Sequence, residues 1–142
     1  MEKIIYIDID DTLADWTGGM DKAKELNPAM SFPQAEYGFY SNLTPIDGGV
    51  EAIEWLLSSR FFNPFVLTAP SVMNPMCYTE KRVWVEKYLG MEMAKKLIIS
   101  PDKSLLKGDY LIDDKLVGRG QDNFEGLIIC LLYTSPSPRD RG

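Results

Sequence analysis

Residues 4 to 13 of the chain read IIYIDIDDTL. The run Ile4–Ile9 is apolar and rich in β-branched side chains, and it ends among the carboxylates of Asp8, Asp10 and Asp11. A continuous apolar run of this length is typical of a strand that is covered on both faces, as in a parallel sheet. We therefore predict a buried strand over Ile4–Ile9 with acidic side chains at its carboxyl end.

The rest of the chain alternates between expected helices and expected strands. Helices are predicted over Thr17–Asn27, Val50–Leu57 and Thr79–Leu89. Short apolar runs predict strands at Phe65–Leu67, Leu97–Ile99, Tyr110–Ile112 and Leu127–Ile129. Between them, Ala29–Leu43 is expected to be irregular apart from a short helix after Pro33. This alternation implies βαβ units, and hence an α/β fold with a mainly parallel sheet.

The composition limits the class of protein. The 142 residues are 45% hydrophobic and 25% charged, which suits one soluble α/β domain. The net charge of −6 argues against binding to polymeric nucleic acid, because a protein that binds it needs a basic face. No apolar run approaches the roughly 20 residues that span a bilayer, and no secretory signal precedes the first strand. The two cysteines form no disulfide framework and histidine is absent, so we expect a cytoplasmic protein without membrane contacts or a histidine-based site.

Two acidic pairs follow predicted strands. Asp8 and Asp10 stand at positions i and i+2, so both side chains point the same way where the first strand ends. Asp113 and Asp114 follow the strand Tyr110–Ile112. Because the carboxyl ends of parallel strands share one edge of the sheet, Asp8, Asp10 and Asp113 are expected to converge there. Such oxygen ligands suit Mg²⁺, whereas a solvated turn is the alternative for either pair.

Thr68 and Lys81 add groups that could bind a phosphate. Thr68 follows the strand Phe65–Leu67, where its hydroxyl and a backbone N–H could hold a phosphate oxygen, with a plain turn before Pro70 as the alternative. Lys81 falls on the core-facing stripe of its helix, which is an unusual place for a lysine. Its ammonium group could hold the same phosphate, and a snorkelling lysine is the alternative.

Together these residues resemble the four motifs of the haloacid dehalogenase (HAD) superfamily of phosphatases. Four segments are similar to the 5′(3′)-deoxyribonucleotidase family: Asp11–Trp16, Leu67–Pro70, Glu80–Gly90 and Leu111–Asp114. The resemblance runs from Ile4 to about Ile129. It implies a HAD-like Rossmannoid three-layer domain over residues 1–14 and 45–129. A small helical cap over residues 15–44 would be inserted after the first strand.

The resemblance also implies a function, which is Mg²⁺-dependent hydrolysis of (deoxy)ribonucleoside monophosphates through an aspartyl-phosphate. Asp8 would be the nucleophile, and Asp10 would act as general acid and then general base. The implied metal ligands are Asp8, the backbone carbonyl of Asp10, and Asp113, supported by Asp114 and Thr12. The implied phosphate-binding groups are Thr68, the N–H of Ala69, and Lys81.

The expected cap would bind the base of the substrate. Trp16 matches a position at which members of the family pack an aromatic ring on the base, and Phe39 and Tyr40 are further candidates. Ordinary packing inside the cap is the alternative for these two residues. The cap is shorter than in the animal members. Pro101 stands where those members place a phosphate-contacting arginine, for which the neighbouring Lys103 could compensate.

The stretch from Cys130 onward differs in composition from the rest. It is a low-complexity Ser/Pro sequence, and Cys130–Asp140 matches the translation of a transposon adapter used in sequencing libraries. We interpret residues 130–142 as a non-native tail, with a disordered terminus as the alternative. On this interpretation a final helix is missing, and a folded but inactive fragment is a further hypothesis.

Other functions stay open at this point. A different phosphatase of the same superfamily would act on sugar or amino-acid phosphates. A phospho-receiver signalling domain also gathers acidic residues, a threonine, a lysine and Mg²⁺, but its phospho-accepting aspartate lies in mid-chain, where this chain has Thr68. The expected binding partner is a nucleoside monophosphate. A homodimer is possible as well as a monomer.

Overall fold

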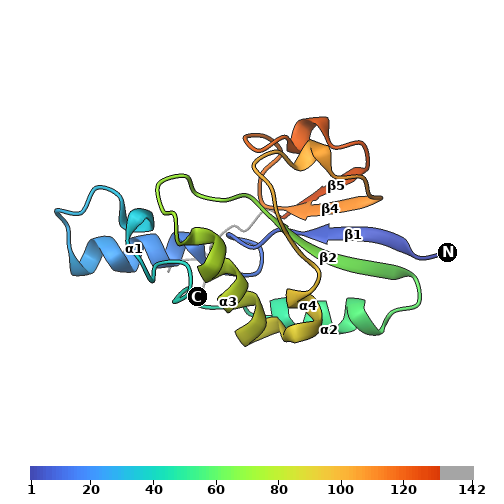
Figure 1. Cartoon of the computed structure of the whole chain (residues 1–142), viewed down its shortest axis with the longest axis horizontal. Helices are drawn as coiled ribbons and strands as arrows, with labels where there is room; N and C mark the ends of the chain where they lie inside the picture. Colours follow the sequence, from blue (N-terminus) through green and yellow to red (C-terminus); the bar gives the residue numbers. More distant parts are fainter. Residues whose placement is uncertain (132–142) are drawn as a thin grey trace, which may run out of the picture.

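Five parallel strands form the centre of the computed structural model, which describes residues 1–131 (Figure 1). Their order across the sheet is β3-β2-β1-β4-β5, and every neighbouring pair is parallel. The strands are β1 (Lys3–Ile7), β2 (Phe62–Thr68), β3 (Leu97–Ile99), β4 (Tyr110–Asp113) and β5 (Leu127–Cys130). This confirms the predicted α/β fold. The direction in which the chain adds strands reverses between β1 and β4, and ligands of open α/β sheets bind beside such a point.

The connections contain four α-helices and three short 3₁₀ turns within residues 1–131. The helices are α1 (Trp16–Leu26), α2 (Gly49–Ser58), α3 (Cys77–Leu89) and α4 (Met91–Ala94). The turns are η1 (Pro33–Ala35), η2 (Lys103–Leu105) and η3 (Gln121–Asn123). The helix expected after Pro33 is η1. The sequence did not predict α4, η2 and η3, because three or four residues are too few to show a helical period.

The core forms on both faces of the sheet. Ile5 and Ile7 of β1 pack with Trp84 of α3 in one buried cluster. Tyr6, between them, packs on the opposite face with Leu67 and other side chains. Figure 1 shows α2, α3 and α4 together on one side of the strands and the chain around η2 and η3 on the other. Burial on both faces explains why β1 is apolar at consecutive positions.

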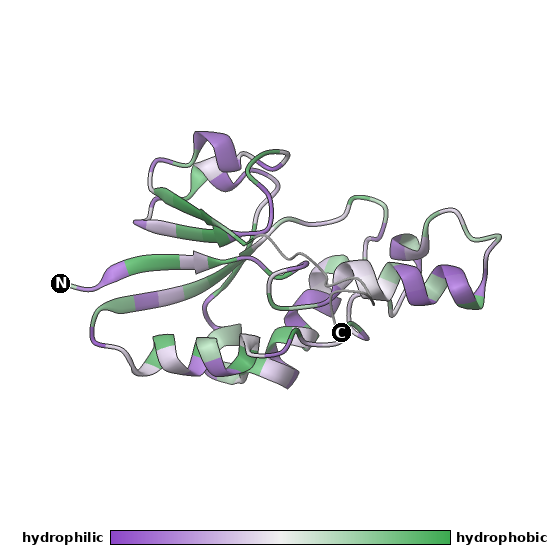
Figure 2. Cartoon of the chain, turned by 180° about the vertical axis from the view of Figure 1, so that it is seen from behind, coloured by the Kyte–Doolittle hydropathy of each residue, from purple (hydrophilic) through white to green (hydrophobic). Residues whose placement is uncertain are grey.

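The segment 15–44 projects beyond the carboxyl ends of the strands (Figure 1). Its helix α1 contains no buried residue, and Figure 2 colours much of it as hydrophilic. Asp15 caps this helix by accepting a hydrogen bond from the Gly18 N–H at 2.9 Å. Asp11, at a left-handed φ of 59°, accepts bonds from the Thr17 N–H and hydroxyl at 2.9 and 2.6 Å. Local hydrogen bonds therefore start the helix, and its division from the core as a cap domain stays a prediction.

Candidate active site

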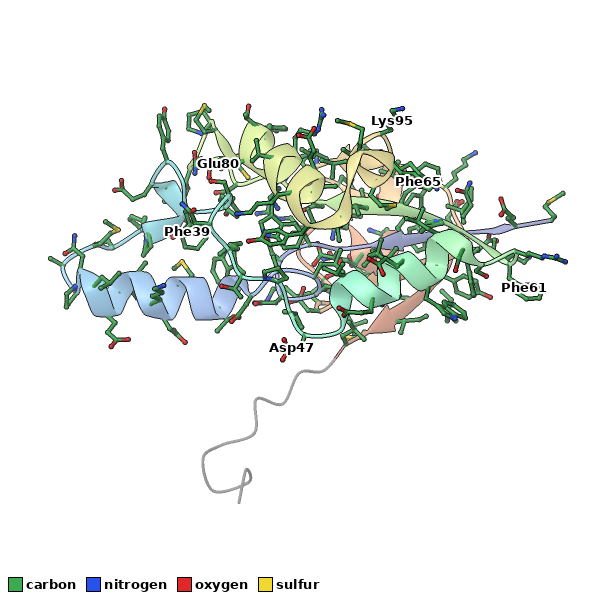
Figure 3. All side chains as sticks on the ribbon, turned by 90° about the horizontal axis from the view of Figure 1, so that it is seen from below. Phe39, Asp47, Phe61, Phe65, Glu80 and Lys95 are labelled. Carbon is green, nitrogen blue, oxygen red and sulfur yellow. The ribbon has the colours of Figure 1, made fainter. Side chains whose placement is uncertain are left out.

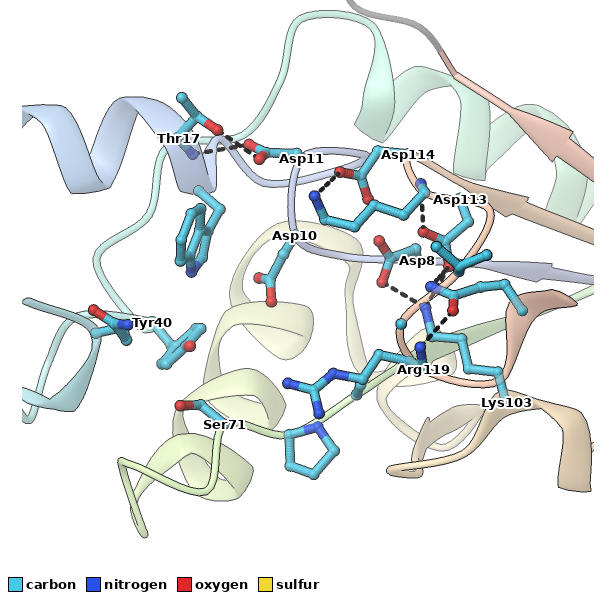
Figure 4. Close-up of a pocket in the computed structure, with 18 of the residues that line it drawn as sticks. Asp8, Asp10, Asp11, Thr17, Tyr40, Ser71, Lys103, Asp113, Asp114 and Arg119 are labelled. Atoms are coloured by element: carbon cyan, nitrogen blue, oxygen red, sulfur yellow. Dashed lines mark hydrogen bonds and ion pairs between the residues drawn. The ribbon is translucent and has the colours of Figure 1, made fainter. Parts of the chain in front are cut away.

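The carboxyl ends of the strands open into a cavity of about 580 Å³ (Figure 4). Residues from both acidic pairs line it, together with residues from the segment 15–44. Among the lining residues are Asp8, Asp10, Trp16, Tyr40, Ala69, Ser71, Lys103, Asp113, Asp114 and Arg119. The convergence expected for Asp8, Asp10 and Asp113 is thus present at the edge where the parallel sheet was predicted to bring them together.

Asp8 is buried and is bonded to a lysine. The ammonium of Lys103 donates to Asp8 Oδ1 at 2.9 Å and to Asp113 Oδ2 at 2.6 Å (Figure 4). Burial raises the pKa of Asp8 well above its usual range; Lys103 opposes this rise, and the nearby charges of Asp113 and Asp10 add to it. Burial by itself lowers the pKa of Lys103, but Asp8 and Asp113 outweigh it, so that this pKa lies above its ordinary value. Lys103 is therefore held in its charged form between two carboxylates.

The sequence alone gave Lys103 only a compensating role, so its place between Asp8 and Asp113 is new. It begins η2, four residues after β3 ends, and the residue is only 1% exposed. Its backbone N–H donates to the Arg119 carbonyl at 2.7 Å, which ties this loop to the loop that follows β4. A lysine soon after a short apolar strand, at the edge that carries the aspartates, is the sequence signal that could have identified it.

Three carboxylates lie close enough together to share a cation. One oxygen each from Asp8, Asp113 and Asp114 falls within 4.8 Å of the others. Burial raises the pKa of Asp114 too. A hydrogen bond with Asp8 opposes this rise, and the negative charge of Asp113 adds to it. When ionised, the three carry one negative charge each and Lys103 supplies one positive charge, so a divalent cation would balance the remainder. This set of hard oxygen donors fits Mg²⁺.

Asp10 is held by a second lysine, at a different place. The ammonium of Lys81, which is 1% exposed, donates to Asp10 Oδ2 at 2.9 Å, to the Thr68 hydroxyl, and to the Ala69 carbonyl at 2.9 Å. This lysine therefore does not snorkel. Within residues 1–131, neither Thr68 nor Lys81 lines the cavity, so both stand behind Asp10. Asp10 Oδ1 is buried and has no hydrogen-bond partner among the described residues, which leaves it available to a bound group.

The three aromatic candidates differ in their access to the cavity. Trp16 and Tyr40 line it, whereas Phe39 does not belong to the lining found within residues 1–131. The Phe39 ring packs edge-on against Trp16 at 6.4 Å and against Tyr40 at 5.1 Å between centroids. Burial raises the pKa of Tyr40 to about 12, against the effect of a hydrogen bond with Ser71, so its hydroxyl stays protonated at neutral pH.

Comparison with known proteins points to one family. The model of a family described as "5′ nucleotidase, deoxy (Pyrimidine), cytosolic type C protein" matches residues 27–139. This match overlaps the stretch interpreted as a non-native tail. Apart from Cys130, which belongs to β5, and Leu131, that stretch lies outside the described residues.

Individual relatives agree with the family match. The chain is 36% identical over 114 residues (79% of the chain) to a Vibrio phage KVP40 protein named "Putative 5′(3′)-deoxyribonucleotidase". It is 32% identical over 123 residues (85% of the chain) to a Bordetella bronchiseptica protein of the same name. It is also 36% identical over 85 residues (60% of the chain) to the human "5′(3′)-deoxyribonucleotidase, cytosolic type". The chain spans 66%, 63% and 42% of the lengths of these relatives, respectively.

Proposed function

The chain belongs to the 5′(3′)-deoxyribonucleotidase family, and from this premise we propose that it hydrolyses nucleoside monophosphates, 2′-deoxynucleotides among them, to nucleoside and inorganic phosphate. One observation carries the proposal. Two carboxylates at one cavity are held by two different buried lysines, Asp8 by Lys103 and Asp10 by Lys81. Separate surroundings allow two chemically similar groups to take separate roles.

Asp8 is suited to attack phosphorus. Its Oδ1 is bonded to Lys103, whereas Oδ2 lies 3.4 Å from the Thr12 hydroxyl, which is a weak partner. Oδ2 would form a bond to phosphorus while the bond from phosphorus to the nucleoside oxygen breaks, giving an aspartyl-phosphate. The ammonium of Lys103 would remain beside the reacting carboxyl and offset negative charge on the phosphoryl group.

Asp10 is suited to move the protons. As a carboxylic acid it would give its proton to the departing nucleoside oxygen, and as a carboxylate it would take a proton from the water that attacks phosphorus. This second step breaks the bond between Asp8 and phosphorus, releases phosphate and regenerates both carboxyl groups. The bond from Lys81 to Oδ2 would fix the group, so that the unpaired Oδ1 is the oxygen left to exchange protons.

Mg²⁺ would be held by Asp8, Asp113 and Asp114. When bound it would screen the charge of the phosphate from that of the carboxylates and help to place the phosphate next to Asp8. The carbonyl of Asp10, which the family resemblance adds to the ligands, stays part of this proposal. Asp114 was expected only to support the metal, and the position of its carboxylate favours a direct role.

We expect phosphate release from 2′-deoxynucleoside monophosphates to require Mg²⁺. Chelation with EDTA should lower the rate by about 100-fold or more, and excess Mg²⁺ should restore it, because uncompensated carboxylates would repel the anionic substrate. A phosphate-release assay over a panel of deoxynucleotides, ribonucleotides, sugar phosphates and phosphoserine measures this. Turnover of a sugar phosphate or phosphoserine with none of any nucleotide would favour the other HAD phosphatases. A long-lived phosphorylated protein without turnover would favour a receiver domain.

Replacement of Trp16 by alanine should weaken binding of the base. Stacking on an aromatic ring is worth about 1–3 kcal/mol per base, so KM for a deoxynucleotide should rise about tenfold with little change in kcat. Steady-state kinetics on the deoxynucleotide and on deoxyribose 5-phosphate, which has no base, measure the effect. Trp55→Ala is the matched control, since Trp55 lies on α2, is 62% exposed and does not line the cavity. An equal loss on both substrates would argue against stacking by Trp16.

The location of the protein in the cell and its oligomeric state belong to the same proposal. No helix within residues 1–131 has the length and apolar character needed to cross a bilayer. We propose a cytoplasmic location, which agrees with the free thiol of the buried Cys77. A homodimer stays a prediction.

A further inference from the structure

Glu80 is a buried carboxylate that the proposed chemistry does not use. It lies on α3, is 6% exposed, and faces the segment that carries Phe39 (Figure 3). Its Oε2 accepts a hydrogen bond from the Gly38 N–H at 2.8 Å. Its Oε1 accepts from the N–H groups of Tyr40 and Ser41 at 3.0 and 3.1 Å. Bonds from backbone N–H groups to an ionised carboxylate are among the stronger hydrogen bonds in proteins.

Asn74 holds the same segment a few residues earlier. It is fully buried in the loop between β2 and α3, and its Nδ2 donates to the carbonyls of Gln34 and Glu36 at 3.2 and 3.1 Å. Its Oδ1 accepts from the Met76 N–H at 3.0 Å, which fixes the orientation of the amide. We call Glu80 and Asn74, with their five bonds to the backbone of residues 34–41, the backbone clamp.

The clamped segment supplies one wall of the cavity. Gln34 and Tyr40 both line it, as do Asp8 and Asp113 from the strand ends. Because the clamp binds only main-chain groups, the side chains of residues 34–41 are free of it, and the clamp sets where their backbone stands. Hydrogen bonds and close packing of this kind hold a site in its binding geometry before the ligand arrives.

We propose that Glu80 and Asn74 are positioning residues that hold Tyr40 and Gln34 at the cavity wall and thereby set the affinity for the base-bearing part of the substrate. This rests on the proposed function. The neighbouring residue on α3, Lys81, holds Asp10, so one helix positions the base-binding wall through Glu80 and the proton-transferring group through Lys81. The two effects are separable, because a substrate without a base should depend only on the second.

The test is Glu80→Gln, which keeps the size of the side chain. An amide has one acceptor oxygen in place of two and turns an N–H donor towards one of the three backbone N–H groups. Loss of a hydrogen bond to a charged group changes an equilibrium constant by a factor of about ten or more. KM for a deoxynucleotide should therefore rise about tenfold. The kcat for the nucleotide and the kcat/KM for deoxyribose 5-phosphate should stay within about twofold.

The matched control is Glu86→Gln, the same change on the same helix. Glu86 is exposed and forms an ion pair with Arg82, which is also exposed, so its replacement should leave the kinetics on both substrates unchanged. Asn74→Ala is a second variant, expected to act in the same direction as Glu80→Gln. Losses of equal size on both substrates in the two clamp variants, or no change on either substrate, would overturn the proposal.

Amide hydrogen exchange gives a readout that does not depend on substrate. The N–H groups of Gly38, Tyr40 and Ser41 should exchange about tenfold faster in Glu80→Gln than in the unchanged chain, and at the unchanged rate in Glu86→Gln. Unchanged exchange at these three positions would overturn the clamp itself. If the unchanged chain hydrolyses deoxyribose 5-phosphate but no nucleotide, the proposed function fails, whereas the exchange rates still decide for or against the clamp.

Discussion

Asp8→Asn should abolish turnover, with kcat lowered by about 10⁴-fold or more, as for the loss of other enzymatic nucleophiles. The amide nitrogen cannot form the bond to phosphorus, while the amide oxygen can still accept the hydrogen bond that Lys103 donates to Oδ1. Single-turnover assays with the best deoxynucleotide measure the loss. Mass spectrometry after acid quenching should detect the aspartyl-phosphate in the unchanged chain and none in the variant.

The same substitution separates chemistry from folding. Asp8 and Asp113 are buried and Asp114 is partly buried, and their three carboxylates lie close together, so removal of one negative charge should keep or raise Tm in EDTA. Asp47→Asn makes the same change at an exposed position and should leave kcat unchanged. Turnover that survives Asp8→Asn would reject Asp8 as the nucleophile. A large fall in Tm would mean that unfolding explains the loss of activity.

Lys103→Met should destabilise the fold as well as stop the reaction. The substitution keeps an apolar stem of similar length but leaves Asp8 and Asp113 buried without their ammonium partner. Loss of one member of a buried ion pair lowers the free energy of unfolding by about 3–5 kcal/mol. We expect a loss of this size in urea titrations carried out in EDTA, and a smaller loss with Mg²⁺ present, because the cation compensates the same carboxylates.

A double-mutant cycle tests whether charge is the cause. Asp8→Asn in the background of Lys103→Met removes one uncompensated carboxylate, so the double variant should be more stable than Lys103→Met alone. Lys95→Met changes an exposed lysine and should alter the free energy of unfolding by less than about 0.5 kcal/mol. If the effects of the Asp8 and Lys103 substitutions simply add, the two side chains do not interact in the way that the structure indicates.

The sheet and the acidic edge could be predicted because they depend on local pattern. An apolar run followed by carboxylates identifies β1, and parallel topology alone brings Asp8, Asp10 and Asp113 to one edge. The helix α3 was predicted over Thr79–Leu89 and begins two residues earlier, at Cys77. Its first turn lacks a side-chain cap, so the sequence carries no marker of the true start.

Lys103 could not be placed in this way, because its position depends on contacts between distant loops. The three residues of β3 and the turn η2 show no period. The side chain is directed inward by two carboxylates, one of them 95 positions away in the chain, and its backbone is tied to Arg119. The roles of Thr68 and Lys81 as phosphate ligands stay predictions, since both stand behind Asp10 with their hydrogen bonds directed at each other and at Asp10 and Ala69.

The role of Glu80 could not be predicted from the sequence, for a different reason. It belongs to the segment Glu80–Gly90, on which the family resemblance partly rests, but nothing in its neighbours marks it as buried. A glutamate in the first turn of a helix is ordinarily explained by the helix dipole. Its three partners are backbone N–H groups of residues 38, 40 and 41, which no sequence pattern reveals.

The spread of the site over successive strand ends also bears on how the chain folds. The bond from Lys103 to Asp8 closes a loop between residues 95 positions apart, and that from Lys81 to Asp10 one between residues 71 positions apart. Loops of this length close only after the intervening strands have paired, because their closure entropy must be offset by contacts formed in between. Helices such as α3 can form early from local contacts. We therefore expect the candidate catalytic groups to meet late in folding, after the strands that carry them have paired.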